Sequence, residues 1–421
     1  MRHKFIQAAA ALGGLLATTA LAQAQTATED ELRDLRQRID TLEAQQAALE
    51  TKQEAQEEDI LSGFRINGVE SLGDPDQIGQ RNGLGRLSFG AGQATTITLY
   101  GFVRAEAFYD TDFSFGDLTR AGRVGDTAFA TDGEFDTSVR VSRFGIRSRT
   151  DTDIGKIETQ LEFDLFGGSD EEGSSPTLRL RHANVEFNDT LLIGQFWSNF
   201  QPLVHYPTSA DFNGPVGIAF ARVPQIRYTY NGGNGFQASA SIEESNGGNS
   251  GDPVLTAAAF YETDAFSVRA AALTGTFRDG AQEFDTNGVT LSGQIKPWQG
   301  GTISATYVTG EALGNLLIGG GARQVGGQEN DSDGFTVEYR QDIGEKWNVG
   351  IAYGNESYDL GTAVGATGNA FTDLDSIHIN AFYTPVENLT IGVEYIQIQS
   401  EGPGGFSAEG DRIGASVTFR F

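Results

Sequence analysis

The chain has 421 residues with 29 Lys and Arg against 57 Asp and Glu, a net charge of −28. Such an acidic chain lacks the basic surface that nucleic-acid binding needs, so no nucleic-acid partner is expected. It has no Cys, which excludes disulfides, thiolate metal sites and thiol nucleophiles. With 55 Gly, 28 Phe and only 38% hydrophobic residues, the composition is unlike that of an ordinary cytosolic enzyme.

The first 24 residues have the features of a secretory signal peptide. Arg2 and Lys4 supply positive charge, residues 5–21 are apolar and rich in Ala, and Ala22-Gln23-Ala24 fits the small-x-small cleavage rule. A membrane anchor is the alternative, but the apolar stretch is shorter than the roughly 20 residues that cross a bilayer. We therefore expect residues 1–24 to be removed on export.

Residues 25–60 are predicted to form a helical coiled coil. Thr28-x-x-Glu31 is a capping-box pattern, and apolar residues then follow heptad spacing from Leu32 to Ile60. The segment 38–43 also resembles a short pattern found in three-stranded coiled coils. A single solvated acidic helix is the alternative, because Gln occupies several later seam positions. The favoured interpretation is a periplasmic trimeric coiled coil, which makes the protein a homotrimer.

Residues 61–96 are dense in Gly, Asn, Asp and Ser and show no hydrophobic period, so they are predicted to be a linker. From Ile97 onward the period changes to two. In residues 157–165, for example, apolar residues alternate with Glu158, Gln160, Glu162 and Asp164. This alternation predicts strands with one apolar face, although a soluble sandwich would show it too.

The connections between strands separate a membrane barrel from a sandwich. Tight turns such as Asn188-Asp189 alternate with long polar connections such as 110–136, 198–223, 310–333 and 355–374. This arrangement is typical of outer-membrane barrels, with turns in the periplasm and loops outside. The fold class is therefore predicted to be all-β, a 16-stranded antiparallel transmembrane β-barrel of the porin type over residues 97–421, preceded by the coiled coil. Fourteen or eighteen strands are the alternatives.

The sequence ends in an alternating segment that closes on Phe421. This ending resembles the C-terminal signal that bacterial barrel-assembly machinery recognises, so that machinery is an expected partner. Outer-membrane lipid is another, and the acidic loops are expected to meet the divalent cations that bridge lipopolysaccharide.

A 16-stranded barrel leaves an aqueous channel, so residues on the polar faces of its strands contact solute. An Arg on the lipid face would cost about 2–4 kcal/mol, so the Arg residues of these strands are expected inside. In residues 143–149 the Arg positions share one parity and Phe144 the other. The facing of Arg181 is open, because the alternation changes parity there. The predicted pore-lining residues are Arg104, Arg143, Arg147, Arg149, Arg179, Arg181, Arg222, Arg227, His205 and Asp211. The alternative is that Glu158, Glu162 and Asp164 pair with the Arg residues and leave no net field.

The connection 198–223 contains hydrophobic residues that are unusual in an exposed loop, and folding into the lumen would bury them. Several motifs here and nearby resemble the DcaP-like porins: Ser142-Arg143-Phe144-Gly145, Arg179-Leu180-Arg181-His182-Ala183, residues 192–200, Asn213-Gly214-Pro215-Val216-Gly217 and residues 224–228. The resemblance implies a trimeric barrel with an N-terminal coiled coil that takes up dicarboxylic and other organic anions. Phosphate-selective porins also carry such a helix, but this barrel lacks their Lys-rich character.

Other chemistry has weaker support in the sequence. His205, Ser209 and Asp211 share one loop, but no nucleophile-elbow pattern occurs, so an enzyme is not expected. Asp331-x-Asp333-Gly334 lacks the full EF-hand spacing, and no metal site or cofactor is expected. The leading function is passive diffusion of small anionic solutes. The alternatives are a cation-preferring general porin, suggested by the acidic composition, and a structural tether from outer membrane to cell wall.

Overall fold

A computed structural model describes residues 86–89, 95–168, 176–245, 252–364 and 369–421. The expected signal peptide and the expected coiled coil lie outside the described residues. Within the described part, no helix is both long and apolar enough to cross a membrane.

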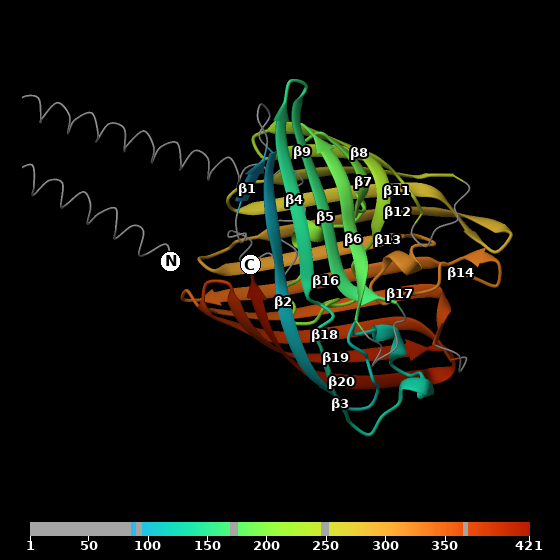
Figure 1. Ribbon diagram of the computed structural model, residues 1–421. Coiled ribbons are helices and arrows are strands. Elements are labelled where there is room, and N and C mark those ends of the chain that lie inside the picture. Colours follow the sequence, from blue (N-terminus) through green and yellow to red (C-terminus); the bar gives the residue numbers. More distant parts are fainter. Residues whose placement is uncertain (1–85, 90–94, 169–175, 246–251, 365–368) are drawn as a thin grey trace, which may run out of the picture. The chain divides into compact units, whose positions relative to one another are not determined.

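Antiparallel strands make up most of the described chain (Figure 1). They are β1 (Arg86–Phe89), β2 (Thr95–Asp110), β3 (Glu134–Ser138), β4 (Arg143–Thr152), β5 (Gly155–Gly167), β6 (Thr177–Phe187), β7 (Leu191–Trp197), β8 (Arg222–Gly233), β9 (Phe236–Glu243), β10 (Val254–Glu262), β11 (Phe266–Asp279), β12 (Gln282–Ile295), β13 (Gly301–Glu311), β14 (Gln324–Val325), β15 (Gln328–Glu329), β16 (Asp331–Ile343), β17 (Trp347–Val364), β18 (Asn369–Val386), β19 (Leu389–Gly402) and β20 (Phe406–Arg420). Short 3₁₀ helices lie in the connections: Ala121–Arg123, Thr127–Phe129, Leu203–His205, Gly314–Leu316 and Pro403–Gly405.

The wall is a closed barrel of sixteen strand positions, as the sequence predicts. Each strand pairs with its neighbour along the chain, and β2 pairs with β20 to close the ring. β3 and β4 share one position, because both pair with β2 and a break at residues 139–142 separates them. β14 and β15 form a separate small hairpin in the long connection before β16. Closure leaves no unpaired sheet edge around the ring, which is a requirement for strands in lipid.

The side chains of the wall are inverted relative to a soluble protein. On β8, the polar side chains of Gln225, Arg227 and Thr229 are buried, whereas Ile226 and Tyr228 are more than half exposed. The period of two thus directs polar groups into the barrel and apolar groups outward. An outward apolar surface around a closed barrel is stable in lipid and costly in water, so the wall is built for a membrane.

The first strand begins earlier than predicted. The sequence assigns residues 61–96 to a linker, but residues 86–89 form β1 and β2 starts at Thr95. β20 pairs with β2 only from Phe102 onward, which leaves the start of β2 without that neighbour. β1 pairs with β2 at residues 95–98, so it extends the sheet where β20 stops. No period-two pattern marks so short a strand.

Connections of two to five residues, among them 188–190, join the strands at one end of the barrel. Asn188 and Asp189 both have positive φ, at 50° and 56°, which suits the turns that match the twist of paired strands. At the other end the prediction of a long connection over 355–374 is wrong, because β17 and β18 continue to Val364 and Asn369. In these ends the buried side chains include Tyr358, Phe371 and Leu374, while Asp359 is exposed, so the polar-inside, apolar-outside alternation of the wall is lost there.

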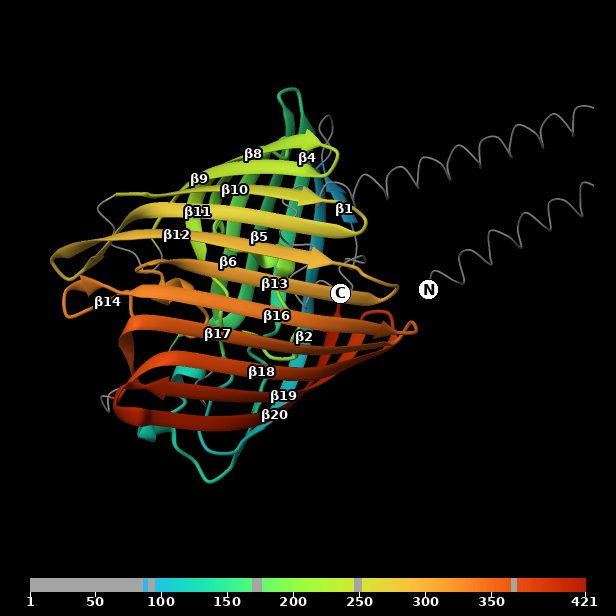
Figure 2. The same cartoon turned by 180° about the vertical axis from the view of Figure 1, so that it is seen from behind.

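The segment 198–221, here called the inward loop, joins β7 to β8 and is buried over most of its length. It packs with two other connections, 111–133 and 312–330, against the inner faces of the wall strands. Their shared apolar cluster includes Phe115, Val124, Phe200, Val216, Leu313, Leu316, Tyr358, Leu374, Ile396 and Ile398. Figures 1 and 2 show the hairpin with β14 and the teal connection 111–133 at the end of the barrel that lies away from the C-terminus. The interior beside β10 to β13 and β16 to β19 is therefore occupied by packed loops.

Candidate functional site

A β-bulge between β5 and β6 places two consecutive polar side chains inside the barrel. Glu162 pairs with His182, but the next residue on β5, Phe163, pairs with Leu180, so Arg181 is the extra residue. Both Arg181 and His182 are almost fully buried. An extra residue in one strand re-aims its side chains, which is why sequence alternation alone left the facing of Arg181 open.

Two carboxylates on β5 bind three of the predicted Arg residues. Glu162 lies 2.7 Å from Nε of Arg181 and 3.5 Å from Nε of Arg143. Asp164 accepts hydrogen bonds from Nε and Nη2 of Arg179 at 2.9 and 2.7 Å, and from Nη1 of Arg181 at 3.0 Å. Bidentate pairs of this kind hold guanidinium groups in fixed orientations. Arg143, Arg179 and Arg181 are therefore paired with Glu162 and Asp164, as the alternative interpretation of the sequence expected.

Arg222 is the member of this group that has no carboxylate partner. Its guanidinium lies over the ring of Trp197, 4.7 Å from the centroid, and near the ring of Phe220 at 5.9 Å. Within the described residues it forms no ion pair, and its buried Nη1 has no hydrogen-bond acceptor. Arg143, Arg179 and Arg181 lie within electrostatic range of it. We call these four residues, with Glu162 and Asp164, the Arg cluster. Four guanidiniums and two carboxylates leave it a formal charge of +2.

The remaining predicted Arg residues lie outside the cluster. Arg104 pairs with Glu106 at 2.6 Å. Arg147 lies over the ring of Tyr100, 4.3 Å from its centroid, and Arg149 is partly exposed near the turn that follows β4. Arg227 lies five positions along β8 from Arg222, roughly 16 Å in an extended strand. Burial and parity alone do not show which of the inward Arg residues keep an uncompensated charge.

His205 is held in the inward loop by the barrel wall. Its Nδ1 lies 2.7 Å from Oγ of Ser292 and its Nε2 lies 2.8 Å from Oγ of Ser267. Burial, and then the charge of Arg269, lower the pKa of His205 to about 3. A neutral imidazole accepts one hydrogen bond and donates another, so His205 anchors the loop without adding charge.

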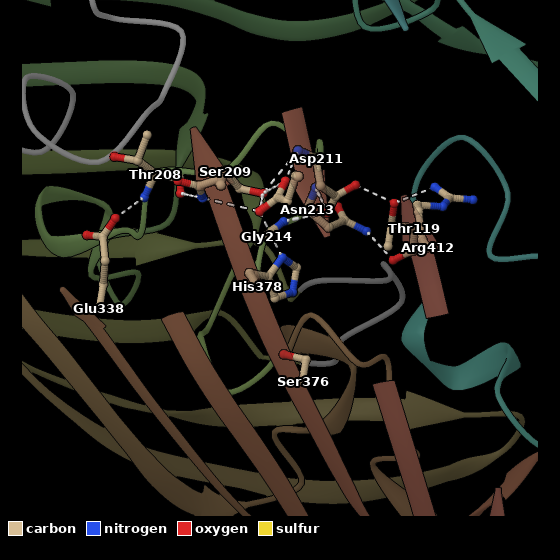
Figure 3. A network of polar contacts seen from close by, with 12 residues as sticks. Thr119, Thr208, Ser209, Asp211, Asn213, Gly214, Glu338, Ser376, His378 and Arg412 are labelled. Atoms are coloured by element: carbon tan, nitrogen blue, oxygen red, sulfur yellow. Dashed lines mark hydrogen bonds and ion pairs between the residues drawn. The ribbon is translucent and has the colours of Figure 1, made fainter. Parts of the chain in front are cut away.

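Asp211 connects the inward loop to the connection 111–133 (Figure 3). Its carboxylate accepts hydrogen bonds from the backbone N–H of Asn213 and Gly214, and from the hydroxyl of Thr119. Burial, together with the nearby charge of Glu394, raises the pKa of Asp211 above its usual value. Asp211 therefore stabilises the loop turn, and the structure does not bring it to the Arg cluster.

Buried acids of the wall accept hydrogen bonds from the backbone of the inward loop. Glu243 binds N–H of Asn199 at 2.8 Å, Glu338 binds N–H of Thr208 at 2.8 Å, and Glu356 binds N–H of Gly217 at 2.9 Å. Glu394 accepts from Oγ of Ser209 at 2.8 Å and from N–H of Asp211 at 2.7 Å. Charge-assisted bonds of this kind are about twice as strong as neutral ones. Part of the acidic composition thus fixes a loop in place.

Among the described residues, no group of three or more His, Asp and Glu side chains is arranged to hold a metal ion. The Arg cluster instead provides guanidinium donors that are held in fixed orientations in an interior of low dielectric constant. Such donors bind carboxylates and other oxyanions.

Comparison with known proteins agrees with this architecture. The solved outer-membrane channel DcaP of Acinetobacter baumannii has 26% identity to the chain and a TM-score of 0.70, over 78% of this chain and 97% of that one. An anion-selective porin from Comamonas acidovorans, at 13% identity and a TM-score of 0.54, shares the fold over 78% of this chain and 100% of its own. The comparison with curated protein sequences gives no match. Residues 19–251 match the DcaP outer membrane protein family, and the chain therefore belongs to this family of outer-membrane channels.

Proposed function

We propose that this outer-membrane channel lets small hydrophilic solutes diffuse passively and prefers organic anions such as dicarboxylates. The observation that carries the proposal is Arg222, a half-buried Arg without a carboxylate partner among the described residues, which lies beside three other Arg residues. A charge at a narrow, low-dielectric point of a channel dominates the energy barrier that a passing ion meets.

The route that we propose runs between the Arg cluster and the inward loop. The packed loops lie against β10 to β13 and β16 to β19, whereas the cluster belongs to β4, β5, β6 and the start of β8. There the inward loop approaches the cluster through Phe212, whose ring lies 5.9 Å from the guanidinium of Arg179, and Phe220, whose ring lies 5.9 Å from that of Arg222. A dicarboxylate would bind Arg222 through one carboxylate and a neighbouring guanidinium through the other. Transfer between adjacent donors favours passage over trapping, because no single site has to bind the solute tightly.

The proposal extends to the assembly. The predicted coiled coil of residues 25–60 would hold a homotrimer in the periplasm, and Phe421 would serve recognition by the barrel-assembly machinery. The outer surface would meet lipid and, at the acidic loops, lipopolysaccharide with its bridging cations. We propose no enzymatic activity and no cofactor.

Planar-bilayer recordings in unequal KCl concentrations test the proposal. We expect the reversal potential to have the sign of a channel that prefers anions. We also expect added dicarboxylate to reduce the chloride current, because the two anions compete for the channel. A reversal potential of the opposite sign would support a cation-preferring general porin instead. Absence of conductance from folded, inserted protein would support a structural tether.

A further inference from the structure

A second guanidinium pair lies inside the barrel, away from the Arg cluster. Arg227 on β8 and Arg269 on β11 both line a cavity on the inner wall, with Asn199 of the inward loop and Ser239 of β9. Both Arg side chains are almost fully buried. Arg269 is three residues from the start of β11, which follows a short turn, so the cavity belongs to the short-turn half of the barrel.

The donors of this cavity are held in fixed orientations, and among the described residues two of them, on Arg269 and Asn199, have no acceptor. Nε of Arg227 donates to Gln225 at 2.9 Å, and Nη2 of Arg269 donates to the carbonyl oxygen of Asn199. Oγ of Ser239 donates to Oδ1 of Asn199 at 2.7 Å, which sets the orientation of that amide. In the described part of the chain, Nη1 of Arg269 and Nδ2 of Asn199 are buried without a hydrogen-bond partner. Buried unpaired donors are costly, so their presence beside a cavity indicates a ligand that pairs with them.

The charge and the lining residues of the cavity indicate the class of ligand that it would bind. The carboxylate of Glu243 interacts electrostatically with Arg269, but among the described residues the two form no ion pair. The carboxylate of Glu243 instead accepts hydrogen bonds from the hydroxyls of Ser198, Ser241 and Thr256 and from the backbone N–H of Asn199. Two guanidiniums and one carboxylate leave a formal charge of +1. The remaining lining consists of Thr229, Gln237, Ala258, Ala259 and Phe260, so it has an apolar part. An anion with an apolar body would satisfy both parts.

We propose that Arg227, Arg269 and Asn199 form a second binding subsite, which takes an organic carboxylate with an apolar body after it has passed the Arg cluster. The carboxylate would accept from Nη1 of Arg269 and Nδ2 of Asn199, and the apolar body would lie on Phe260. The inference rests on the proposed function in one respect, namely that the ligand reaches the cavity through the channel. A second subsite would let a solute leave the cluster stepwise, which raises flux through a selective channel.

Channel recordings with 4-bromobenzoate test the subsite. We expect this aryl carboxylate to block chloride current through the full-length wild-type protein, and 4-bromobenzyl alcohol, which lacks the charge, to leave it unchanged. Arg269→Gln should weaken the block by about tenfold, the loss expected for a hydrogen bond to a charged group. Arg278→Gln is the matched control on the same strand, because Arg278 is half exposed and pairs with Glu283. Equal block in wild type and Arg269→Gln would overturn the proposal.

A crystal of the wild-type protein with 4-bromobenzoate gives a second measurement that needs no variant. Anomalous scattering from bromine beside Phe260 supports the subsite, and bromine found only at the Arg cluster, or nowhere in the barrel, contradicts it. The salt-gradient potential of the wild type separates the two proposals. Anion preference with no role for Arg269 in the block defeats the subsite alone, whereas cation preference with bromine beside Phe260 defeats the proposed function alone.

Discussion

The charge that a solute meets inside this barrel depends on the partner of each Arg side chain more than on the number of Arg residues. Arg104, Arg143, Arg179 and Arg181 all have carboxylates within ion-pair distance, but Arg222 has aromatic rings instead. A cation over an aromatic face keeps its full charge while losing part of its hydration. Its field therefore remains available to a solute.

Changing Arg222 to Gln should reduce anion preference. The side chain keeps a similar length but loses the charge, and about 1 kcal/mol of attraction for a passing anion corresponds to a roughly fivefold lower permeability ratio of anion to cation. Reversal potentials in unequal KCl measure this ratio. Arg278→Gln, which removes an exposed paired charge, is the control. Similar ratios in both variants would show that Arg222 does not control selectivity.

Acid should loosen the inward loop through His205. The pKa of His205 is lowered to about 3 in the docked loop, so the docked form stays neutral where a released imidazole would bind a proton. Docking is thus fully stabilised above about pH 6.5 and weakens as the pH falls towards 3, by up to about 1.4 kcal/mol per pH unit. The raised pKa of Asp211 acts in the opposite direction, because its docked form holds a proton more tightly.

The change His205→Asn isolates the histidine contribution. An amide still offers one donor and one acceptor to Ser267 and Ser292 but does not titrate in this range. We expect current fluctuations of the wild type to increase between pH 6.5 and 4, and those of the variant to increase less. Equal pH dependence in the two proteins would assign the effect to other groups.

At the scale of elements, the inward loop depends on close backbone approach as well as on its acidic anchors. Gly217 has φ of +95°, and a Cβ there would lie 2.3 Å from the carbonyl oxygen of Phe335 and 2.7 Å from that of Asn355. The loop thus lies directly on β16 and β17 at this point. Residues with a side chain cannot make this contact without moving the loop.

Gly217→Ala should therefore displace the inward loop and raise both conductance and current noise. Gly320→Ala is the matched control, because Gly320 also has positive φ, at +75°, but nothing lies within 4 Å of its Cβ position. Both variants carry a backbone cost of about 1–2 kcal/mol for a left-handed alanine. Only Gly217→Ala adds the clash, so identical single-channel records would show that the loop does not restrict the channel.

At the scale of the whole molecule, the net charge of the chain and the charge of the Arg cluster have opposite signs. The chain carries −28, yet the Arg cluster carries a formal +2. Exposed charges are screened beyond about 8 Å at physiological salt, so acids on distant loops act weakly on a solute at the cluster.

Neutralising Glu329, Asp331 and Asp333 together should change the reversal potential little at physiological salt. These residues lie in β15 and β16, next to the long connection that precedes β16. At 10 mM salt the Debye length grows to about 30 Å, and the same triple variant should then shift the potential towards greater anion preference. A larger shift than Arg222→Gln at physiological salt would favour the cation-preferring alternative.

Removal of residues 28–60 should leave a folded barrel. The ring closes through β2 and β20 and contains its own apolar cluster, so its wall does not need the predicted coiled coil for closure. Heat-modifiable migration on gels and resistance to protease would report the folded barrel, and cross-linking would report the trimer. Loss of the folded band would show that the two parts fold together.

The amino-acid sequence by itself determined the barrel, its sixteen strands and the family. These depend on local features, namely a period of two and tight turns such as Asn188-Asp189, which residues close in the chain specify. Where the alternation with a period of two is absent, the prediction of strands from the sequence was wrong. β1 is too short to show it, and the outer ends of β17 and β18 bury the apolar Tyr358, Phe371 and Leu374 inside the barrel instead of polar residues.

Only the tertiary structure decided which charges compensate one another. The bulge at Arg181 turns two neighbouring side chains inward, and the pairing of Glu162 and Asp164 leaves Arg222 with aromatic neighbours. The sequence did not single out Arg269, because it lies in an ordinary alternating strand. Its place in the proposed subsite depends on its contact with Asn199, which is 70 residues away in the chain. The alternation within a strand indicates which side of the wall a residue faces. The partners of a side chain inside the barrel depend on strand register and loop packing, and no local sequence pattern specifies these.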